Sequence, residues 1–143
     1  GKFIPYDKRL LTALQINSFS YIKKFNKEKQ DHLRRILTEG VTQGDSISII
    51  SKQIRDAFKV TAWRSEVIAR TEIVRTYTQA SLTAMKNSGV VKKVKYVTAG
   101  DVRVCPVCKA SNGRIFYLNN IPKKQQIPRH PSCRCEFEEI IEV

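Results

Sequence analysis

The sequence predicts an α+β fold: an N-terminal helical body of about four helices, followed by a small antiparallel β, zinc-knuckle-like C-terminal part. Three observations predict this class. Apolar residues recur three and four positions apart through the first two thirds of the 143 residues. After Gly89 the pattern changes to an alternation of apolar and basic residues, which is typical of a half-buried strand. All four cysteines and one of the two histidines lie in the last third of the chain.

The first two predicted helices cover residues 5–25 and 26–40. In the first, apolar residues from Leu10 to Phe25 recur at helical spacing and form one face. The second is a shorter helix, for which Gly40 is the expected C-cap.

The third predicted helix follows at once, with Asp45 or Ser46 as its N-cap. The fourth is the longest and runs from a cap at Thr61 to a stop at Gly89. Its apolar residues repeat at helical spacing, and Trp63 is interpreted as a core anchor.

Three short strands are expected after the helices, at 90–98, 114–118 and 136–143. The turn Ser111-Asn112-Gly113 precedes the second strand, and a loop with three prolines separates the second strand from the third.

We divide the chain into an N-terminal helical segment, residues 1–40, and a main domain, residues 41–143. Within the main domain, helices occupy 45–88 and the β-rich zinc knuckle occupies 91–143. No run is long and apolar enough to span a bilayer, and the first residues lack the apolar stretch of a secretory leader. The chain begins at Gly1 without a methionine, so we expect the natural protein to be longer.

The cysteines and the second histidine have the spacing of a tetrahedral zinc site. Cys105 and Cys108 form a C-x₂-C pair, and His130 stands three residues before Cys133 and five before Cys135. Two chelating pairs joined by a loop can surround one ion, and Zn²⁺ accepts both thiolate and imidazole ligands. Five candidates compete for four positions. Spacing favours Cys105 and Cys108 with two of the other three, and it predicts one structural Zn²⁺.

Three other readings of the cysteines are weaker. Two disulfides would suit a secreted domain, but nothing in the sequence signals secretion. A redox C-x₂-C motif would need a thioredoxin-like βαβ context. A nucleobase deaminase would need an H-x-E motif before its cysteines, and the sequence contains none.

Basic residues dominate the chain, which carries a formal net charge of +13. Between Val91 and Cys135 there are ten basic residues and a single acid, Asp101. This excess predicts attraction to nucleic acid or to an acidic protein surface. Tyr96, Phe116 and Tyr117 lie among these cations and are candidates for stacking on bases, although core positions are the plainer interpretation. The candidate contacts are Lys92, Lys93, Lys95, Lys109, Lys123, Lys124 and Arg129.

Taken together, several motifs resemble one family. The helix carries Ala69-Arg70-Thr71-Glu72, and a strand follows it. The D-x-R of Asp101 and Arg103 then precedes C-x₂-C, and the chain closes with HPxCRC at 130–135. This combination resembles the phage Mu F-like head-morphogenesis domain of minor capsid proteins, including the SPP1-type minor head protein. The resemblance covers roughly residues 40–140.

The resemblance implies a structural, non-enzymatic protein of the virion or procapsid, present in the host cytoplasm during assembly. Its partners would be the portal or a capsid or scaffold protein, with packaged DNA as a further contact and no membrane. Many family members lack the first cysteine, which shifts weight from Cys105 toward His130, Cys133 and Cys135.

The resemblance also bears on four charged residues and on the alternative functions. For these residues it favours a structural role, in which ion pairs attach the long helix to the knuckle. The alternative is a catalytic pair of carboxylates with arginines that bind a substrate. The alternatives are a nucleic-acid-binding zinc module, the delivery domain of a larger prophage toxin, and a metal-dependent hydrolase, which would need an open coordination position. The four charged residues are Arg70, Glu72, Asp101 and Arg103.

Overall fold

The computed structural model confirms the α+β class and describes residues 8–19 and 22–141. Four helices precede a three-stranded antiparallel sheet, and a fifth short helix lies between the first two strands. No helix in these described ranges is long and apolar enough to cross a membrane. In chain order the elements are α1 (Lys8–Ile16), α2 (Lys27–Gln43), α3 (Ile47–Phe58), α4 (Ala62–Ser88), β1 (Lys93–Val97), α5 (Pro106–Ser111), β2 (Ile115–Tyr117), the 3₁₀ helix η1 (Lys123–Gln125) and β3 (Glu136–Ile140).

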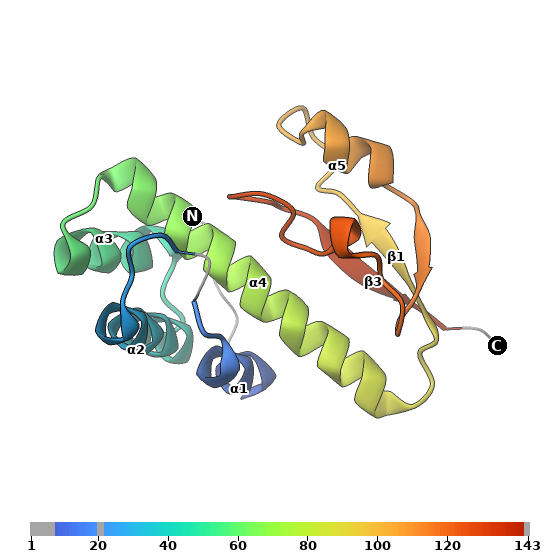
Figure 1. The fold of residues 1–143 in the computed structure, drawn as a ribbon, viewed down its shortest axis with the longest axis horizontal. Helices are drawn as coiled ribbons and strands as arrows, with labels where there is room; N and C mark the ends of the chain where they lie inside the picture. The colour runs from blue at the N-terminus through green and yellow to red at the C-terminus, as the bar shows by residue number, and fades with distance from the viewer. Residues whose placement is uncertain (1–7, 20–21, 142–143) are drawn as a thin grey trace.

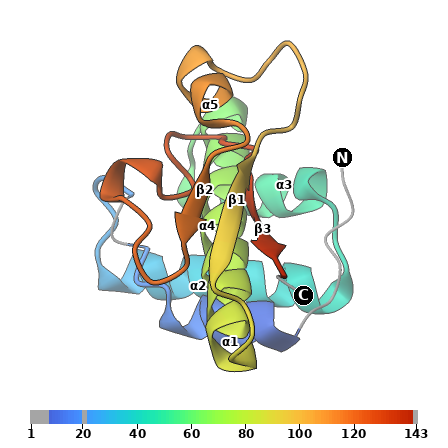
Figure 2. The ribbon, with the colours of Figure 1, turned by 90° about the vertical axis from the view of Figure 1, so that its right-hand side faces the viewer.

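Helix α4 is the central layer of the molecule. Helices α1 and α3 pack on one side of it, with α2 packed against both of them, and the sheet with α5 lies on the other side (Figure 1). Seen from the side of the sheet, α4 runs behind β1 (Figure 2). We call α1–α4 the helical body and residues 91–141 the knuckle.

Two apolar cores flank α4, and α4 contributes side chains to both. Ile68 and Ala69 of α4 belong to the core of the helical body, whereas Met85 belongs to the core of the knuckle. Three of the four cysteines are buried in the knuckle core: Cys108, Cys133 and Cys135.

The sheet has the strand order β2-β1-β3, with β1 in the middle. Val94 and Tyr96 of β1 point into the knuckle core and are fully buried, because alternate residues of a strand share one face. Lys95 lies on the outer face, between Ile115 of β2 and Glu138 of β3. The predicted alternation therefore assigned the two faces of β1 correctly.

Short-range signals marked three helix ends. The Ser46 hydroxyl accepts a hydrogen bond from the backbone N–H of Ile49, and the Thr61 hydroxyl accepts one from that of Arg64. Gly89 ends α4 with φ 73°. Ser46 and Thr61 bind N–H groups that the start of a helix leaves without partners. Gly89 supplies the left-handed backbone conformation that ends a helix.

The first helix is shorter than predicted, since α1 stops at Ile16. The Arg34 guanidinium of α2 donates hydrogen bonds to the carbonyls of Leu14 and Asn17, which a helix end leaves free. The chain then turns at Phe19, whose φ is 55° and whose side chain is fully buried in the core. Residues 5–7, 20 and 21 of the predicted helix lie outside the described residues.

Gly40 is not the C-cap of α2, and that prediction was wrong. The helix continues to Gln43, and Gly44 takes the left-handed conformation with φ 71°. Gly40 instead lies where α2 crosses α3, and a Cβ atom added there would lie 2.6 Å from Ile50 Cδ1. The glycine is required for close approach of two helices, which a reading of α2 alone does not reveal.

Two further expectations fail. Trp63 is not a core anchor, because 76% of its surface is exposed at the start of α4. Helix α5 was not predicted, although Pro106 at its first turn is a common helix start.

Candidate metal centre

The first two thiols are brought together by the start of α5. Cys105 is the N-cap of this helix, and its Sγ accepts a hydrogen bond of 3.3 Å from the backbone N–H of Cys108. Pro106 between them favours the helical turn, because its ring presets φ. C-x₂-C at a helix start therefore places both sulfurs on the same side of the turn.

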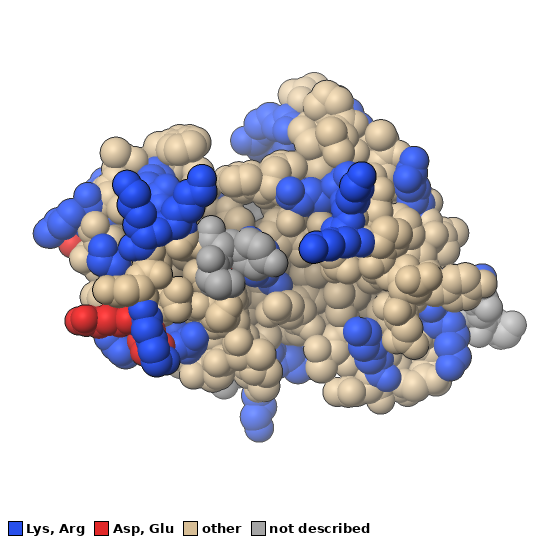
Figure 3. Space-filling view, viewed as in Figure 1, with Lys and Arg blue, Asp and Glu red and all other residues tan. Residues whose placement is uncertain are grey.

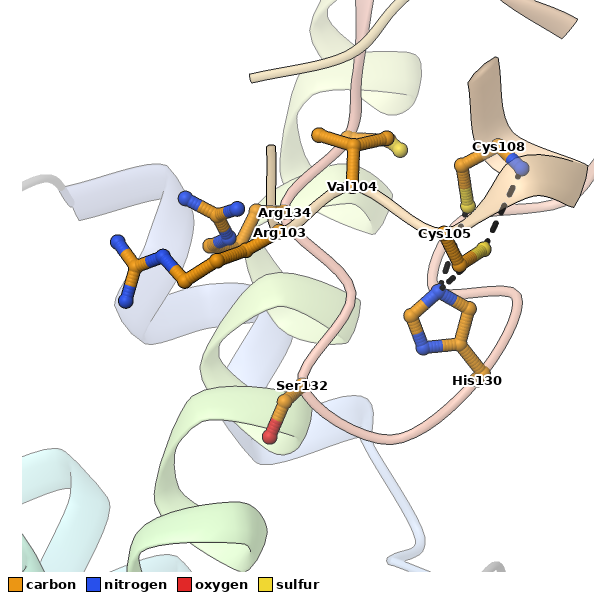
Figure 4. A pocket seen from close by; sticks show the side chains of 8 residues that line it. Arg103, Val104, Cys105, Cys108, His130, Ser132 and Arg134 are labelled. Carbon is orange, nitrogen blue, oxygen red and sulfur yellow. Dashed lines mark hydrogen bonds between the residues drawn. The ribbon is translucent and has the colours of Figure 1, made fainter. Parts of the chain in front are cut away.

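His130 reaches both of these thiols from the loop before β3. Its Nε2 atom lies 3.4 Å from Cys105 Sγ and 3.3 Å from Cys108 Sγ, as the dashed lines in Figure 4 show. Its Nδ1 atom lies 2.8 Å from the carbonyl oxygen of Pro131. A carbonyl can only accept, so Nδ1 is the donor in this contact, and Nε2 faces the two sulfurs. Metal-binding histidines are commonly held by such a second hydrogen bond.

All five predicted donors belong to two overlapping groups. Cys105, Cys108 and His130 form one, and Cys108, Cys133 and Cys135 form the other, with the donor atoms of each group within 4.8 Å of one another. Cys108 is common to both. A tetrahedral zinc ion with ordinary bond lengths would hold a sulfur and a nitrogen about 3.5 Å apart. The Sγ–Nε2 distances of 3.3 and 3.4 Å fit that spacing, so these groups are placed to hold a metal ion.

Three of the thiols have shifted pKa values, in opposite directions. The backbone N–H of Cys108, followed by the Cys108 side chain, lowers the pKa of Cys105 to about 7. Burial raises the pKa of Cys108, and it raises the pKa of Cys135 to about 12. A cation bound among them would reverse this effect, because a coordinating thiol is deprotonated.

Tyr96 takes part in this centre in a way that the sequence did not reveal. Its hydroxyl donates a hydrogen bond of 3.6 Å to Cys108 Sγ, and its ring meets Phe137 edge-on at 5.9 Å. Burial, then the thiols of Cys135 and Cys108, raise the pKa of Tyr96. The residue is fully buried, so the interpretation as a base-stacking aromatic was wrong and the plainer core assignment holds.

The D-x-R motif anchors the loop before α5. Asp101 receives two hydrogen bonds from the Arg134 guanidinium, at 2.5 and 2.6 Å, and one of 2.9 Å from the backbone N–H of Arg103. Arg134 is the main cause that holds the pKa of Asp101 below its usual value. The side chains of Arg103 and Arg134 point away from Cys105 and Cys108 in Figure 4.

The A-R-T-E segment contacts the knuckle through its threonine. Arg70 pairs with Glu66 of its own helix at 2.9 Å. Glu72 is buried and faces the helical body, where Arg75 and Asn17 each lie 3.4 Å from its Oε1. Arg70 with Glu66 and Arg75 with Glu72 are ion pairs, but neither pair contacts the knuckle. Contact with the metal-site loop is made by Thr71, whose hydroxyl accepts a hydrogen bond of 2.9 Å from the backbone N–H of Ser132.

The comparison with protein families matches residues 31–138 to the family described as phage Mu protein F like protein. The chain belongs to this family. Membership assigns it a role in phage head morphogenesis, in the virion or procapsid. The comparisons with curated proteins and with solved structures give no match.

The predicted basic contacts of this Mu F-like chain lie on several elements of the knuckle. Lys93 and Lys95 are on the outer face of β1, where Lys93 lies over the Tyr117 ring at 5.4 Å. Arg129 is engaged inside the knuckle, since its guanidinium donates hydrogen bonds to the Val107 carbonyl and the Ser111 hydroxyl. The exposed members are Lys92, Lys95, Lys109, Lys123 and Lys124.

Proposed function

We propose that this chain is a minor head-protein module of a tailed phage or prophage, whose knuckle is held together by one structural zinc ion. Cys108, His130 and two of the remaining three cysteines would hold the ion. One observation carries the proposal: Cys108 is shared by two groups of donors, and the Nε2 atom of His130 faces its sulfur at 3.3 Å. The module would bind the portal, a capsid protein or a scaffold protein.

The donor set supports zinc in a structural role. Thiolate and imidazole together suit Zn²⁺, whereas Mg²⁺ and Ca²⁺ prefer oxygen ligands. Five protein donors for four positions would leave no place for a water molecule, which a hydrolytic zinc ion requires. The proposed role is therefore to hold α5, the loop after η1 and β3 together.

Metal analysis tests the zinc. Protein purified without added metal is expected to contain about one zinc per chain, and a chelator is expected to lower its melting temperature, because an ion that binds only the folded state stabilises it. An unchanged melting temperature after complete zinc removal would exclude a structural ion.

Co-assembly tests the partner. The chain would be expressed together with the portal and capsid proteins of the same phage, and the assemblies would be separated by size on a gradient. We expect the chain to sediment with the portal ring, and with zinc removed we expect this association to weaken. Sedimentation of the chain alone, beside intact portal rings and capsid shells, would refute the proposed association.

The second candidate is a zinc module that contacts nucleic acid through the knuckle. The exposed lysines of β1, α5 and η1 support it. Substituting these lysines would then reduce both the affinity for generic DNA and its salt dependence.

A further inference from the structure

A second basic surface lies at the far end of the helical body from the sheet. Lys52, Arg55 and Lys59 are spaced three and four residues apart, so they share one face of α3 and its C-cap. Trp63 and Arg64 follow in the first turn of α4, and all five are exposed. We call these five residues the α3–α4 patch. Figure 3 shows lysine and arginine side chains gathered over α3 and the start of α4.

The charges of this patch are poorly neutralised. Residues 52–64 contain four basic side chains and one acid, Asp56. Asp56 lies 3.8 Å from Arg55, and both are exposed, so this pair is weak. No described residue forms an ion pair with Lys52, Lys59 or Arg64. On the outer face of the sheet, by contrast, Lys95 stands opposite Glu138.

Trp63 sets this patch apart from a merely solvated basic face. It is the only tryptophan of the chain, and 76% of its surface is exposed. An exposed indole among cations suits a ligand with flat aromatic groups and regularly spaced negative charges. An anchor for a protein partner would be ringed by exposed apolar side chains, but the exposed large hydrophobic residues nearest to Trp63 in the described sequence are Ile49 and Tyr77, each 14 positions away.

We infer that the α3–α4 patch binds nucleic acid, with its four cations on backbone phosphates and a base stacked on the Trp63 indole. The inference is independent of the zinc ion, since the patch lies on the helical body. It also differs from the lysine-rich knuckle as a DNA contact, because it places the contact on another part of the chain.

The fluorescence of Trp63 tests the inference directly, because no other tryptophan contributes. A single-stranded oligonucleotide is expected to quench this emission. The logarithm of the binding constant is expected to fall with that of the salt concentration with a slope of about −3, for four phosphate contacts on a single strand. A duplex of the same length separates paired from unpaired DNA: quenching by both means that the patch accepts either form. Polyglutamate is the charge control, and equal quenching by it would overturn the inference in favour of an acidic protein partner.

Matched variants locate the contact. Replacing Lys52, Arg55, Lys59 and Arg64 by glutamine is expected to weaken binding of a labelled oligonucleotide, measured by anisotropy, at least tenfold. The control replaces four exposed knuckle lysines, Lys92, Lys95, Lys109 and Lys123, and removes the same charge. Trp63→Ala is expected to weaken binding about tenfold at constant salt slope. Equal losses in the two quadruple variants, or full affinity in Trp63→Ala, would overturn the inference.

Discussion

The hydroxyl of Thr71 accepts a 2.9 Å hydrogen bond from the backbone N–H of Ser132, 61 positions later in the chain. This bond joins the middle of α4 to the loop between His130 and Cys133. Ser132 has a φ of 60°, a left-handed conformation that serine rarely adopts. The contact therefore holds this loop in an unusual backbone conformation between two candidate metal donors, His130 and Cys133.

Removing this acceptor should loosen the loop. Thr71→Val keeps the shape of the side chain but leaves the Ser132 N–H without its partner. We expect a loss of about 1 kcal/mol in the free energy of unfolding and faster release of zinc to a chelator. Thr83→Val, on the exposed side of the same helix, is the control. If both variants release zinc at the wild-type rate, Thr71 does not position the loop.

The thiols should differ in importance according to their place in the two donor groups. Cys108→Ser removes the only member shared by both groups, so we expect zinc content to fall close to zero and the melting temperature to drop. Cys105→Ser leaves His130 and three cysteines, which are still four donors, and we expect it to retain zinc. Lys123→Ala is the control for a change outside the site. Elemental analysis and thermal melting distinguish these cases, and equal zinc loss in the two cysteine variants would contradict the ranking.

Glu72 should make stability depend on pH. Burial raises the pKa of this carboxyl above its usual value of 4.5, against the lowering effect of Arg75 and Asn17. A group whose pKa is raised in the folded state contributes stability that is fully present below its unfolded pKa. That contribution is lost as the pH rises through the folded pKa. We therefore expect Glu72→Gln to be more stable than the wild type at pH 7 and equally stable near pH 4.

Urea unfolding between pH 4 and pH 7 measures this difference. Glu66→Gln is the matched control, because Glu66 lies on the same helix with its side chain about half exposed. A Glu72→Gln protein that is less stable than the wild type at pH 7 would mean that the ion pair with Arg75 outweighs the cost of burying the charge.

Gly40 should tolerate no side chain. Alanine normally stabilises a helix interior by up to about 1 kcal/mol relative to glycine. At Gly40 the added Cβ would meet the Ile50 side chain at 2.6 Å, so the buried Ile50 side chain would have to change its rotamer or α2 and α3 would have to separate. We expect Gly40→Ala to destabilise the protein by about 1–3 kcal/mol. Glu39→Ala, one position earlier and exposed, should be nearly neutral in the same denaturation experiment.

Features set by neighbouring residues were predictable from the sequence. The caps at Ser46 and Thr61 act within three residues, and the faces of β1 follow from alternation. The candidate metal donors could be named because chelation requires short spacings such as C-x₂-C, and the structure brings all five into two overlapping groups.

Features set by distant contacts were not predictable. Helix α1 ends early where Arg34, on another helix, binds the carbonyls of Leu14 and of Asn17, the residue after the helix. Periodicity reveals that a helix has an apolar face but not how far along the helix that face is covered, which is why Trp63 was misplaced. The Tyr96 hydroxyl was missed because its partner, Cys108, lies on a different element.

The length of α4 has a consequence for any assembly that includes this protein. Its 27 residues span about 40 Å at the ordinary helical rise. Trp63 lies near one end, and Met85, near the other, packs into the knuckle core. A continuous helix with a core on either side resists bending, so the distance between its two ends stays nearly fixed. If one neighbour in the phage head holds the Trp63 end and another holds the knuckle, this helix sets the distance between them.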